Sequence, residues 1–190
     1  KRMEQLADRV KARRGFWVKS FRSKRELRTW IPQIQKVNNE AFTDIWGYYP
    51  VGDVEIQMIG KQMLALADPR LIKLVMQEDH IAGFAFIFPD VTRALQATHG
   101  RLWPFGWLRI LWAIRKTDRL CGNGIGLLPR YQGLGASMLL YLEMVKAVRA
   151  RGATRCEIAQ VMETNTKSLA DMNRVGVNWH KRHRLYHKSL

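Results

Sequence analysis

A strand that runs through a glycine-containing turn into a helix is the feature of this sequence that most constrains its fold. Residues 125–137 read IGLLPRYQGLGAS, in which an apolar strand precedes the turn and an apolar helix follows it. The unpaired N–H groups in the first turn of a helix bind anions, and the helix macrodipole adds partial positive charge. Glycines in the turn let the backbone approach a diphosphate without a Cβ in the way. The segment therefore predicts a site for the phosphate groups of a ligand.

Two common phosphate motifs do not fit this turn. A P-loop needs a glycine, four residues and then Gly-Lys-Ser/Thr, and this pattern does not occur in the chain. A dinucleotide-binding turn needs a third glycine three residues after Gly135, where Met138 stands. Glu157 lies near the place expected for a ribose-binding acid, but it is in mid-strand and too little chain follows to build a second mononucleotide half. We therefore reject both motifs.

The other elements alternate between strand and helix. Alternating apolar residues predict strands over residues 16–21, 71–77, 80–88, 120–128, 154–162 and 178–187. Apolar residues at helical spacing predict helices over residues 27–46, 54–66, 91–98, 105–115, 132–151 and 165–175. Without a repeat or a linker, we expect one mixed α/β domain over residues 1–190, in which residues 1–14 are a basic helix or linker that ends a preceding domain.

Charge and cysteine usage limit the partners and the compartment. The chain has 32 Lys and Arg against 16 Asp and Glu, a formal net charge of +16, which predicts nucleic acid, a membrane surface or a polyphosphate ligand as partner. The longest apolar stretch, residues 102–114, is too short to span a bilayer, so we expect no transmembrane segment. Two cysteines and no secretory signal predict a reduced, cytoplasmic protein.

The turn also matches a family motif. Residues LLPRY lead into QGLGAS, which resembles motif A of the GNAT superfamily of acyl-CoA-dependent N-acetyltransferases: Gln or Arg, two residues, Gly, one residue, then Gly or Ala. Ser137 stands at the sixth position instead of Gly or Ala. The later strand, Asn165, Gly176 and the closing KRHRLY follow the family order, so the resemblance covers nearly the whole chain from Phe16 onward. The sequences EIAQVMETN, FPD and KRHRLY are similar to uncharacterised bacterial GNAT proteins in which such a domain follows an N-terminal partner domain.

The resemblance implies a fold, a substrate and a binding site. The fold is a GNAT-like mixed central sheet flanked by helices, with splayed central parallel strands, and the substrate is acetyl-CoA or another acyl-CoA, with no metal. Leu127 and Leu128 would pair with the pantetheine arm. Asn165 would bond the pantetheine, cap the last helix, or do both, with Ser168 within reach. The backbone amides expected to hold the CoA pyrophosphate are those of Gln132, Gly133, Leu134, Gly135, Ala136 and Ser137.

The expected chemistry is attack of an amine on a thioester. The amine must lose a proton to a base or a water relay, and the tetrahedral oxyanion needs a donor, for which we expect the backbone N–H near Leu127 or Leu128. The positions where family members keep a strand carboxylate and an acidic tyrosine hold Cys121 and Met172 here.

Substitute catalytic groups therefore have to come from elsewhere in the chain. Glu157 and Tyr186 are the candidates. Glu157 is alternatively an outward-facing charge paired with Arg155 or Arg151, and Tyr186 alternatively packs the last strand. Both cysteines, Cys121 and Cys156, are expected to be small core residues.

Several segments keep more than one interpretation. The aromatic residues of 102–114 predict either an apolar wall for an acyl chain or hydrophobic acceptor, or a helix packed on the sheet. The basic stretch at residues 1–28 faces nucleic acid, anionic lipid, an acidic partner domain or solvent. A small-molecule or peptide amine acceptor would bind between residues 38–60 and 90–106. Two other functions remain beside N-acyl transfer: a catalytically silent CoA-binding domain, and a nucleic-acid-binding module, which is disfavoured because the chain lacks the usual signatures.

Overall fold

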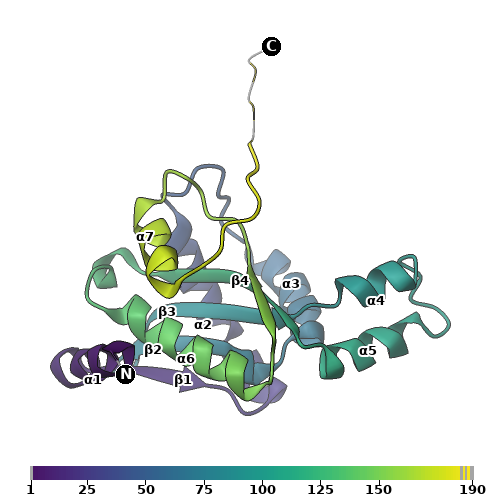
Figure 1. Cartoon of the computed structure of the whole chain (residues 1–190), viewed down its shortest axis with the longest axis horizontal. Helices are drawn as coiled ribbons and strands as arrows, with labels where there is room; N and C mark the ends of the chain where they lie inside the picture. The colour runs from purple at the N-terminus through teal and green to yellow at the C-terminus, as the bar shows by residue number, and fades with distance from the viewer. Residues whose placement is uncertain (1, 185, 187, 189–190) are drawn as a thin grey trace. The chain divides into compact units, whose positions relative to one another are not determined.

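The computed structural model describes residues 2–184, 186 and 188, which fall into two compact units, Lys1–Ala159 and Gln160–Leu190 (Figure 1). The strands of the first unit are β1 (Phe16–Ser20), β2 (Ile72–Gln77), β3 (His80–Pro89), β4 (Arg119–Leu127) and β5 (Arg155–Ile158). Its helices are α1 (Arg2–Arg14), α2 (Lys24–Phe42), α3 (Asp53–Leu66), α4 (Thr92–Ala97), α5 (Gly106–Lys116) and α6 (Ala136–Ala150), with short 3-10 turns η1 (Pro69–Leu71) and η2 (Pro129–Tyr131). The second unit contains α7 (Thr166–Val175).

The strands form one mixed sheet whose spatial order is the order of the chain, β1-β2-β3-β4-β5. The first four strands pair antiparallel, and β4 and β5 pair parallel. This confirms the predicted mixed sheet flanked by helices, and it confirms the hairpin of β2 and β3. The hairpin turn contains no glycine, and Glu78 takes the left-handed conformation there, with φ 52°. The Glu78 carbonyl accepts a hydrogen bond of 3.0 Å from the Trp17 indole N–H.

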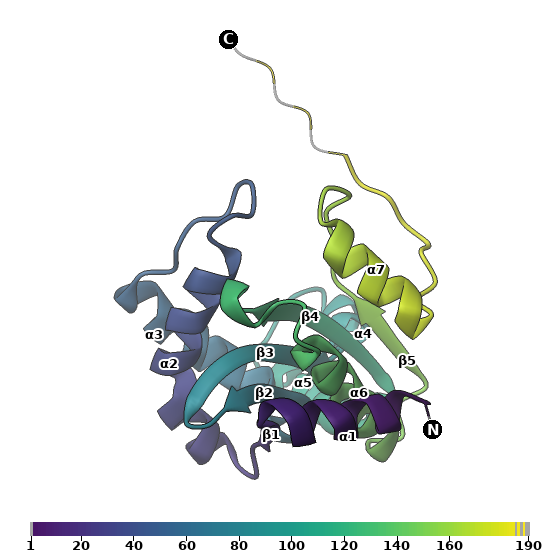
Figure 2. The same ribbon diagram turned by 90° about the vertical axis from the view of Figure 1, so that its left-hand side faces the viewer.

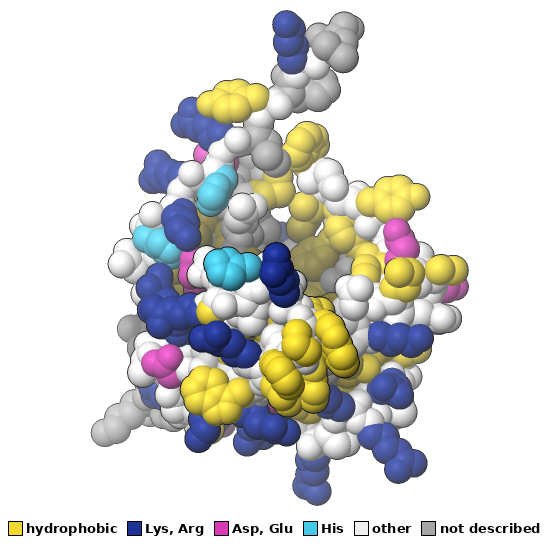
Figure 3. Space-filling view, turned by 90° about the vertical axis from the view of Figure 1, so that its right-hand side faces the viewer, with side chains coloured by type: hydrophobic (Ala, Val, Ile, Leu, Met, Phe, Trp, Pro, Cys, Tyr) yellow, Lys and Arg dark blue, Asp and Glu magenta, His cyan; other side chains and the backbone are white. Residues whose placement is uncertain are grey.

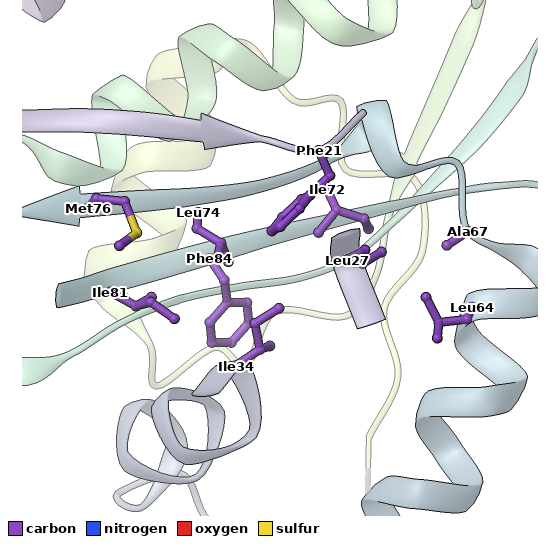
Figure 4. Packing of buried hydrophobic residues seen from close by; sticks show 10 residues of the cluster. All are labelled: Phe21, Leu27, Ile34, Leu64, Ala67, Ile72, Leu74, Met76, Ile81 and Phe84. Atoms are coloured by element: carbon purple, nitrogen blue, oxygen red, sulfur yellow. The ribbon is translucent and has the colours of Figure 1, made fainter. Parts of the chain in front are cut away.

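Helices cover both faces of the sheet, because alternate residues of a strand point to opposite sides. Figure 2 shows α2 and α3 on one side and α1 and α6 on the other. On the first side the core contains Phe21, Leu27, Ile34, Leu64, Ala67, Ile72, Leu74, Met76, Ile81 and Phe84 (Figure 4). On the other side it contains Ala7, Phe16, Val75, Ala82, Ala85, Ala136, Leu139, Leu140 and Leu142.

Helix α1 is part of the first unit's packing. Ala7 is fully buried against α6, and a Cβ added at Gly135 would lie 2.6 Å from Cγ2 of Val10. Gly135 precedes α6 with φ 91°, so both its backbone conformation and the nearness of α1 require glycine there. The basic N-terminal helix therefore lies against the start of the helix that follows the phosphate-motif turn.

The end of the chain differs from the sequence prediction. The strand expected over residues 154–162 stops at Ile158, and α6 begins at Ala136, four residues later than residue 132. The strand expected over residues 178–187 is absent from its described part, residues 178–184 and 186, while 185 and 187 lie outside the described residues. Residues 180–184 are all His, Lys or Arg, so they supply no apolar face for a sheet to bury. Trp179 instead donates its indole N–H to Oδ1 of Asn173 in α7, at 2.8 Å.

A carboxylate between η1 and the end of α6 joins three parts of the first unit. Asp68 Oδ2 lies 2.8 Å from Nη2 of Arg70 and 2.6 Å from Nη1 of Arg151, and only about a tenth of each of the Asp68 and Arg151 side chains is exposed. Arg151 also donates to the carbonyl of Ile114 in α5. Burial alone would raise the pKa of Asp68, but hydrogen bonds from Arg70 and the charges of Arg70 and Arg151 hold it below its usual value.

Replacing Asp68→Asn should therefore destabilise the protein by about 2–4 kcal/mol, because it leaves the buried Arg151 guanidinium without its counter-charge. The folded state holds the carboxyl with a depressed pKa, so the unfolded state takes up the proton first. The contribution of Asp68 is present above about pH 4 and is lost as the pH falls through the depressed pKa. Urea unfolding as a function of pH should show a shallower acid limb for the variant.

The exposed i,i+3 pair of Asp171 with Arg174 provides the matched control, with 3.3 Å between the ionised atoms and an Arg174 side chain that is 69% exposed. Asp171→Asn should cost less than about 1 kcal/mol. Equal losses for the two variants would show that the Asp68 network contributes no more than a surface pair.

Candidate functional site

β4 pairs with β3 over a longer stretch than with β5, and it contains one extra residue where the shorter pairing ends. In the β3–β4 ladder Gly124 pairs with Phe86 while Gly122 pairs with Ile87, so Asn123 has no partner on β3 and forms a bulge. Pairing between β4 and β5 runs from Arg119 to Gly122 and ends there, apart from one further bond of 2.8 Å from Ala159 N–H to the Gly122 carbonyl. The bulge therefore lies directly beyond the last residue of β4 that pairs with β5, and a bulge bends its strand.

Beyond Gly122, none of the described strands pairs with the edge of β4 that faces away from β3. Leu128 N–H donates to the Ala82 carbonyl at 3.0 Å, so the alternation of a strand turns the N–H and C=O of Ile125 and Leu127 away from β3. The Leu127 carbonyl accepts a long bond of 3.4 Å from the Gln132 side chain. Both leucines are the predicted pantetheine contacts, but the N–H of Leu128 is already engaged, and Leu127 alone of the two presents its backbone to the open edge.

The phosphate-motif turn follows directly on this open edge. Gly133 and Gly135 both have left-handed φ, at 75° and 91°. The amides of Ala136, Ser137 and Met138 lie in the first turn of α6, where the helix itself provides no acceptor. Gly135 is the N-cap and has no side chain to accept from them. Ser137 is half-buried in that turn, and Gln132 and Gly133 are exposed. This geometry is suited to an anion that the backbone amides bind.

Two side chains hold η2, and with it the turn, in place. The Tyr131 ring packs edge-on against Phe16 of β1, with 5.9 Å between centroids. Arg130 forms an ion pair with Glu40 of α2, at 2.7 Å from Nη1 to Oε1. The turn is thus tied to β1 on one side and to α2 on the other. Sequence reasoning did not anticipate either contact, because the partners are far apart along the chain.

A polar cluster orders the loop between α2 and α3, which belongs to the expected acceptor region. The Asn39 side-chain oxygen accepts from the Tyr48 hydroxyl at 2.6 Å and from Val51 N–H at 3.0 Å, and Asn38 donates to the Tyr48 hydroxyl at 2.9 Å. Burial raises the pKa of Tyr48, against the opposing effect of the Asn38 hydrogen bond, so the hydroxyl keeps its proton at neutral pH. Sequence reasoning named the region but not this tyrosine.

The aromatic packing places this loop over β4. The Tyr48 ring lies 5.7 Å from the ring of Phe42, and the Phe42 ring lies 5.8 Å from that of Phe84 on β3. A Cβ added at Gly126 would meet Phe84 at 2.6 Å and the Ala41 Cβ at 3.3 Å, so α2 approaches the backbone of β4 closely. The loop between α2 and α3 and the open edge of β4 therefore lie in the same part of the first unit.

The predicted base and the nearby thiol lie opposite each other where β4 and β5 last pair. Glu157 pairs in register with Cys121, one residue before the end of the ladder. Oε2 of Glu157 lies 3.9 Å from Nη2 of Arg155, as in the ion-pair interpretation, whereas Arg151 binds Asp68 instead. Burial and the charges of Asp90 and Glu157 raise the pKa of the Cys121 thiol, so it stays protonated at neutral pH and is a poor nucleophile. Cys121 is half-buried and Cys156 is exposed, so the prediction that both are core residues is wrong.

The remaining predicted site residues belong to the second unit. Asn165 is the N-cap of α7, and its side-chain oxygen accepts from Ser168 N–H at 3.0 Å, which confirms the capping role. Met172 is buried in α7. Tyr186 is 87% exposed, so it does not pack a last strand in this structure. The roles of Asn165, Ser168 and Tyr186 toward a ligand stay predictions.

Helix α5, which holds the aromatic stretch, is not packed on the sheet along its length. It has no buried residue, although its sequence is mostly apolar, because α4 and α5 extend away from the sheet (Figure 1). Of the two interpretations of this stretch, the helix packed on the sheet is therefore wrong, and the apolar wall for an acyl chain or hydrophobic acceptor stays a prediction. Among the described residues, no helix is both long and apolar enough to cross a membrane. The same residues contain no group of three or more His, Cys, Asp or Glu side chains placed to hold a metal ion.

The sequence of this chain is similar to a family model and to two curated proteins. Residues 31–177 match the model of the "Acetyltransferase (GNAT) family". A bacterial ceramide synthase of Caulobacter vibrioides is 28% identical over 168 residues, 84% of this chain and 43% of that protein. Protein YghO of Escherichia coli is 26% identical over 165 residues, 83% of this chain and 42% of that protein. The chain thus spans less than half the length of the curated relatives it matches.

Solved structures show the same fold at low identity. The aminoglycoside acetyltransferase AAC(6')-Iy, in complex with a bisubstrate analog of CoA, aligns with a TM-score of 0.56 and 16% identity, over 92% of this chain and 99% of that one. The ribosomal-protein-S18-alanine N-acetyltransferase of Escherichia coli aligns with a TM-score of 0.59 and 16% identity, over 92% and 84% of the two chains. The matched family model covers most of the chain and includes β4, the turn and α6. The chain belongs to the acetyltransferase (GNAT) family.

Proposed function

We propose that this chain transfers an acyl group from acyl-CoA to the amine of a long-chain acceptor. The single observation that carries the proposal is the unpaired edge of β4 at Leu127, which leads directly into the uncapped first turn of α6. One ligand with a pyrophosphate and an extended amide-bearing arm can use both features. Family membership supports acyl-CoA as that ligand.

The turn and the edge divide the binding of the cofactor-like substrate between them. The amides from Gly133 to Ser137 face the pyrophosphate, where the helix dipole favours negative charge. Exposed cations of α1, including Arg9, Lys11 and Arg13, stand on the helix whose Val10 touches Gly135, and they raise the positive potential around the turn. The backbone of Ile125 and Leu127 pairs with the pantetheine arm as an added strand would.

The transfer itself is attack of a neutral amine on the thioester carbon. In our proposal the Leu127 N–H donates to the oxyanion that develops on the carbonyl oxygen, since Leu128 N–H is held by Ala82. Glu157, one residue before the pairing of β4 with β5 ends, takes the proton that the amine loses, directly or through water. The C–N bond forms, the C–S bond breaks, and the CoA thiolate leaves and takes a proton.

Two observations support a long-chain amine as acceptor. The curated relative from Caulobacter is a ceramide synthase, and a ceramide is an amide of a long-chain amino alcohol. The chain also displays large apolar side chains on α5 and on the loop before it, as an enzyme for amphiphilic substrates would. The names of the solved neighbours give two other acceptors, an aminoglycoside and the alanine of a ribosomal protein. Experiment must distinguish these acceptors from a long-chain amine.

Leu127→Pro tests the open edge. Proline removes the outward N–H and leaves the β3–β4 bonds intact, because a strand tolerates proline where its N–H faces away from the ladder. Turnover of acyl-CoA should fall by about 100-fold or more, the usual effect of losing one oxyanion donor. Steady-state kinetics would measure the loss, and thermal unfolding would check the fold. Leu127→Ala, which keeps the N–H, is the matched control and should retain most of the activity.

Glu157→Gln tests the base. A general base contributes about 100-fold or more, so kcat should fall by that factor while the KM for acyl-CoA changes little. Arg155→Ala removes only the ion-pair partner, so it should leave kcat within a few-fold of the original value. Equal effects of the two substitutions would assign Glu157 to the ion pair and not to proton transfer.

An acceptor panel tests the substrate class. Acetyl-CoA and palmitoyl-CoA should each be offered with sphinganine, an aminoglycoside and an alanine-terminated peptide, and release of free CoA measured by thiol detection. We expect the highest kcat/KM with sphinganine. Preference for the aminoglycoside or the peptide would contradict the long-chain acceptor. If saturating CoA raises the unfolding temperature but every amine fails, the chain is a silent CoA-binding domain.

A further inference from the structure

The hairpin of α4 and α5 has an unusual charge pattern. Between Asp90 and Asp118 the sequence contains no Asp or Glu. The same segment contains five cationic residues, namely Arg93, Arg101, Arg109, Arg115 and Lys116. The segment therefore contributes only positive charge, and all five of these residues are exposed.

The hairpin also displays large apolar side chains to solvent. Trp103 is 83% exposed, Phe105 72% and Trp112 65%. The other exposed apolar residues of the segment are Leu95, Leu102, Trp107, Leu108 and Leu111. A soluble surface rarely leaves so many large apolar groups together without a partner. Figure 3, which faces the end from which α4 and α5 project, shows hydrophobic side chains gathered among Lys and Arg.

On α5 the apolar and basic residues share one outward face. Leu108, Leu111, Trp112 and Arg115 follow a three-and-four spacing, so they lie along one side of the helix, and together with Arg109 they line a shallow depression. The side that faces α4 and the sheet carries Ala113 and the half-buried Ile110 and Ile114. The outward face of α5 therefore combines apolar and basic side chains and is separate from the side that faces α4 and the sheet.

A basic groove lies beside this face, at the base of the hairpin. It has a volume of ≈ 300 Å³ and lies between α4, α5 and the start of β4. Its charged lining consists of Arg93, Arg109, Lys116 and Arg119 with Asp90 and Asp118. Asp90 accepts a hydrogen bond from Thr92 N–H at 2.9 Å, and Asp118 accepts from the Thr154 hydroxyl at 2.5 Å, so both carboxylates are engaged within the fold. The charges of Arg93 and Arg119 also act on both carboxylates, so Arg109 and Lys116 are the lining cations that an anionic headgroup would pair with.

From this arrangement we infer that the α4–α5 hairpin docks on the surface of an anionic phospholipid bilayer. Trp and Leu side chains enter the boundary between headgroups and acyl chains, and Arg and Lys side chains pair with the phosphates. The charge of the hairpin selects this occupant, since a bilayer offers apolar depth and negative charge over the same area. A nucleic-acid duplex keeps its base faces stacked inside, so it would match the cations without burying Trp112 and its leucine neighbours, and a second copy of this hairpin would bring like charges together.

This inference stands apart from the proposed acyl transfer, because vesicle binding can be measured without acyl-CoA or an acceptor. The purified chain should be sedimented with vesicles of phosphatidylcholine alone and with vesicles in which about one third is phosphatidylglycerol. Binding should be confined to the anionic vesicles. It should weaken as salt rises from about 0.1 M to about 1 M, where the Debye length shrinks from about 10 Å to about 3 Å.

Two pairs of variants locate the contact. Leu111→Ser with Trp112→Ser should lower the partition coefficient by about tenfold or more, because the bilayer no longer buries these side chains. Trp46→Ser with Met58→Ser removes side chains that are 67% and 63% exposed, at least as much as Leu111 at 41% and about as much as Trp112 at 65%, from the α2–α3 region and should leave binding unchanged. None of these four residues is buried in the fold, and circular dichroism would verify that each variant folds.

Charge reversal provides the second readout. Arg109→Glu with Arg115→Glu should reduce binding to anionic vesicles by about tenfold or more. Arg149→Glu with Lys61→Glu makes the same change in net charge at exposed positions on α6 and α3 and should have a smaller effect. Equal losses for the two pairs would indicate net charge alone and overturn the docking site. Absence of vesicle binding would also overturn it, as would a dimer that the Leu111 and Trp112 variants disrupt without lipid.

Discussion

The unequal pairing of the two edges of β4 is the constraint on which the proposed site depends. The pairing with β5 stops at Gly122, next to the bulge at Asn123, while the pairing with β3 continues to Leu127. A bulge bends its strand, so the direction of β4 changes at this point. In our proposal the ligand uses the backbone edge that a neighbouring strand would otherwise pair with, and β4 then leads into the turn before α6.

Close packing on both faces of the sheet fixes this segment in place. On one face a Cβ at Gly126 would overlap the Phe84 ring of β3 and lie 3.3 Å from Ala41 of α2. On the other face Val10 of α1 occupies the space that a side chain at Gly135 would need. Ion pairing of Arg130 with Glu40 and packing of Tyr131 on Phe16 secure the turn between these contacts. A binding site made of backbone amides needs such support, because its groups cannot adjust as side chains do.

Two groups of cations within the net charge of +16 have separate proposed roles. The cations of α1 stand beside the turn where we place the pyrophosphate, and those of the α4–α5 hairpin stand among exposed tryptophans and leucines. Lys and Arg can raise the positive electrostatic potential around a small polyanion, and they can also attract the protein to an anionic surface. What distinguishes them is the neighbouring chemistry, which is free backbone N–H groups in one case and large apolar side chains in the other.

The sequence by itself determined the order of elements as far as the last helix, the family, and the position of the glycine turn before α6. These depend on local patterns: alternation, helical spacing, and glycines at fixed offsets from Gln132. Local patterns also misled, since the alternation over residues 178–187 has only basic side chains in its middle and formed no strand within the described residues. They likewise misled for α5, because one interpretation of its amphipathic spacing was a face packed on the sheet, whereas its inner side is only half-buried.

Only the tertiary structure decided which backbone groups remain free and which side chains meet. That Leu127 and not Leu128 faces the open edge follows from the bond between Leu128 and Ala82. That Arg151 binds Asp68 rather than Glu157, and that Tyr48 joins Asn38 and Asn39 over β4, likewise follows from contacts across the fold. Register, bulges and long-range pairs depend on how all the layers pack at once, so no local stretch of sequence contains them.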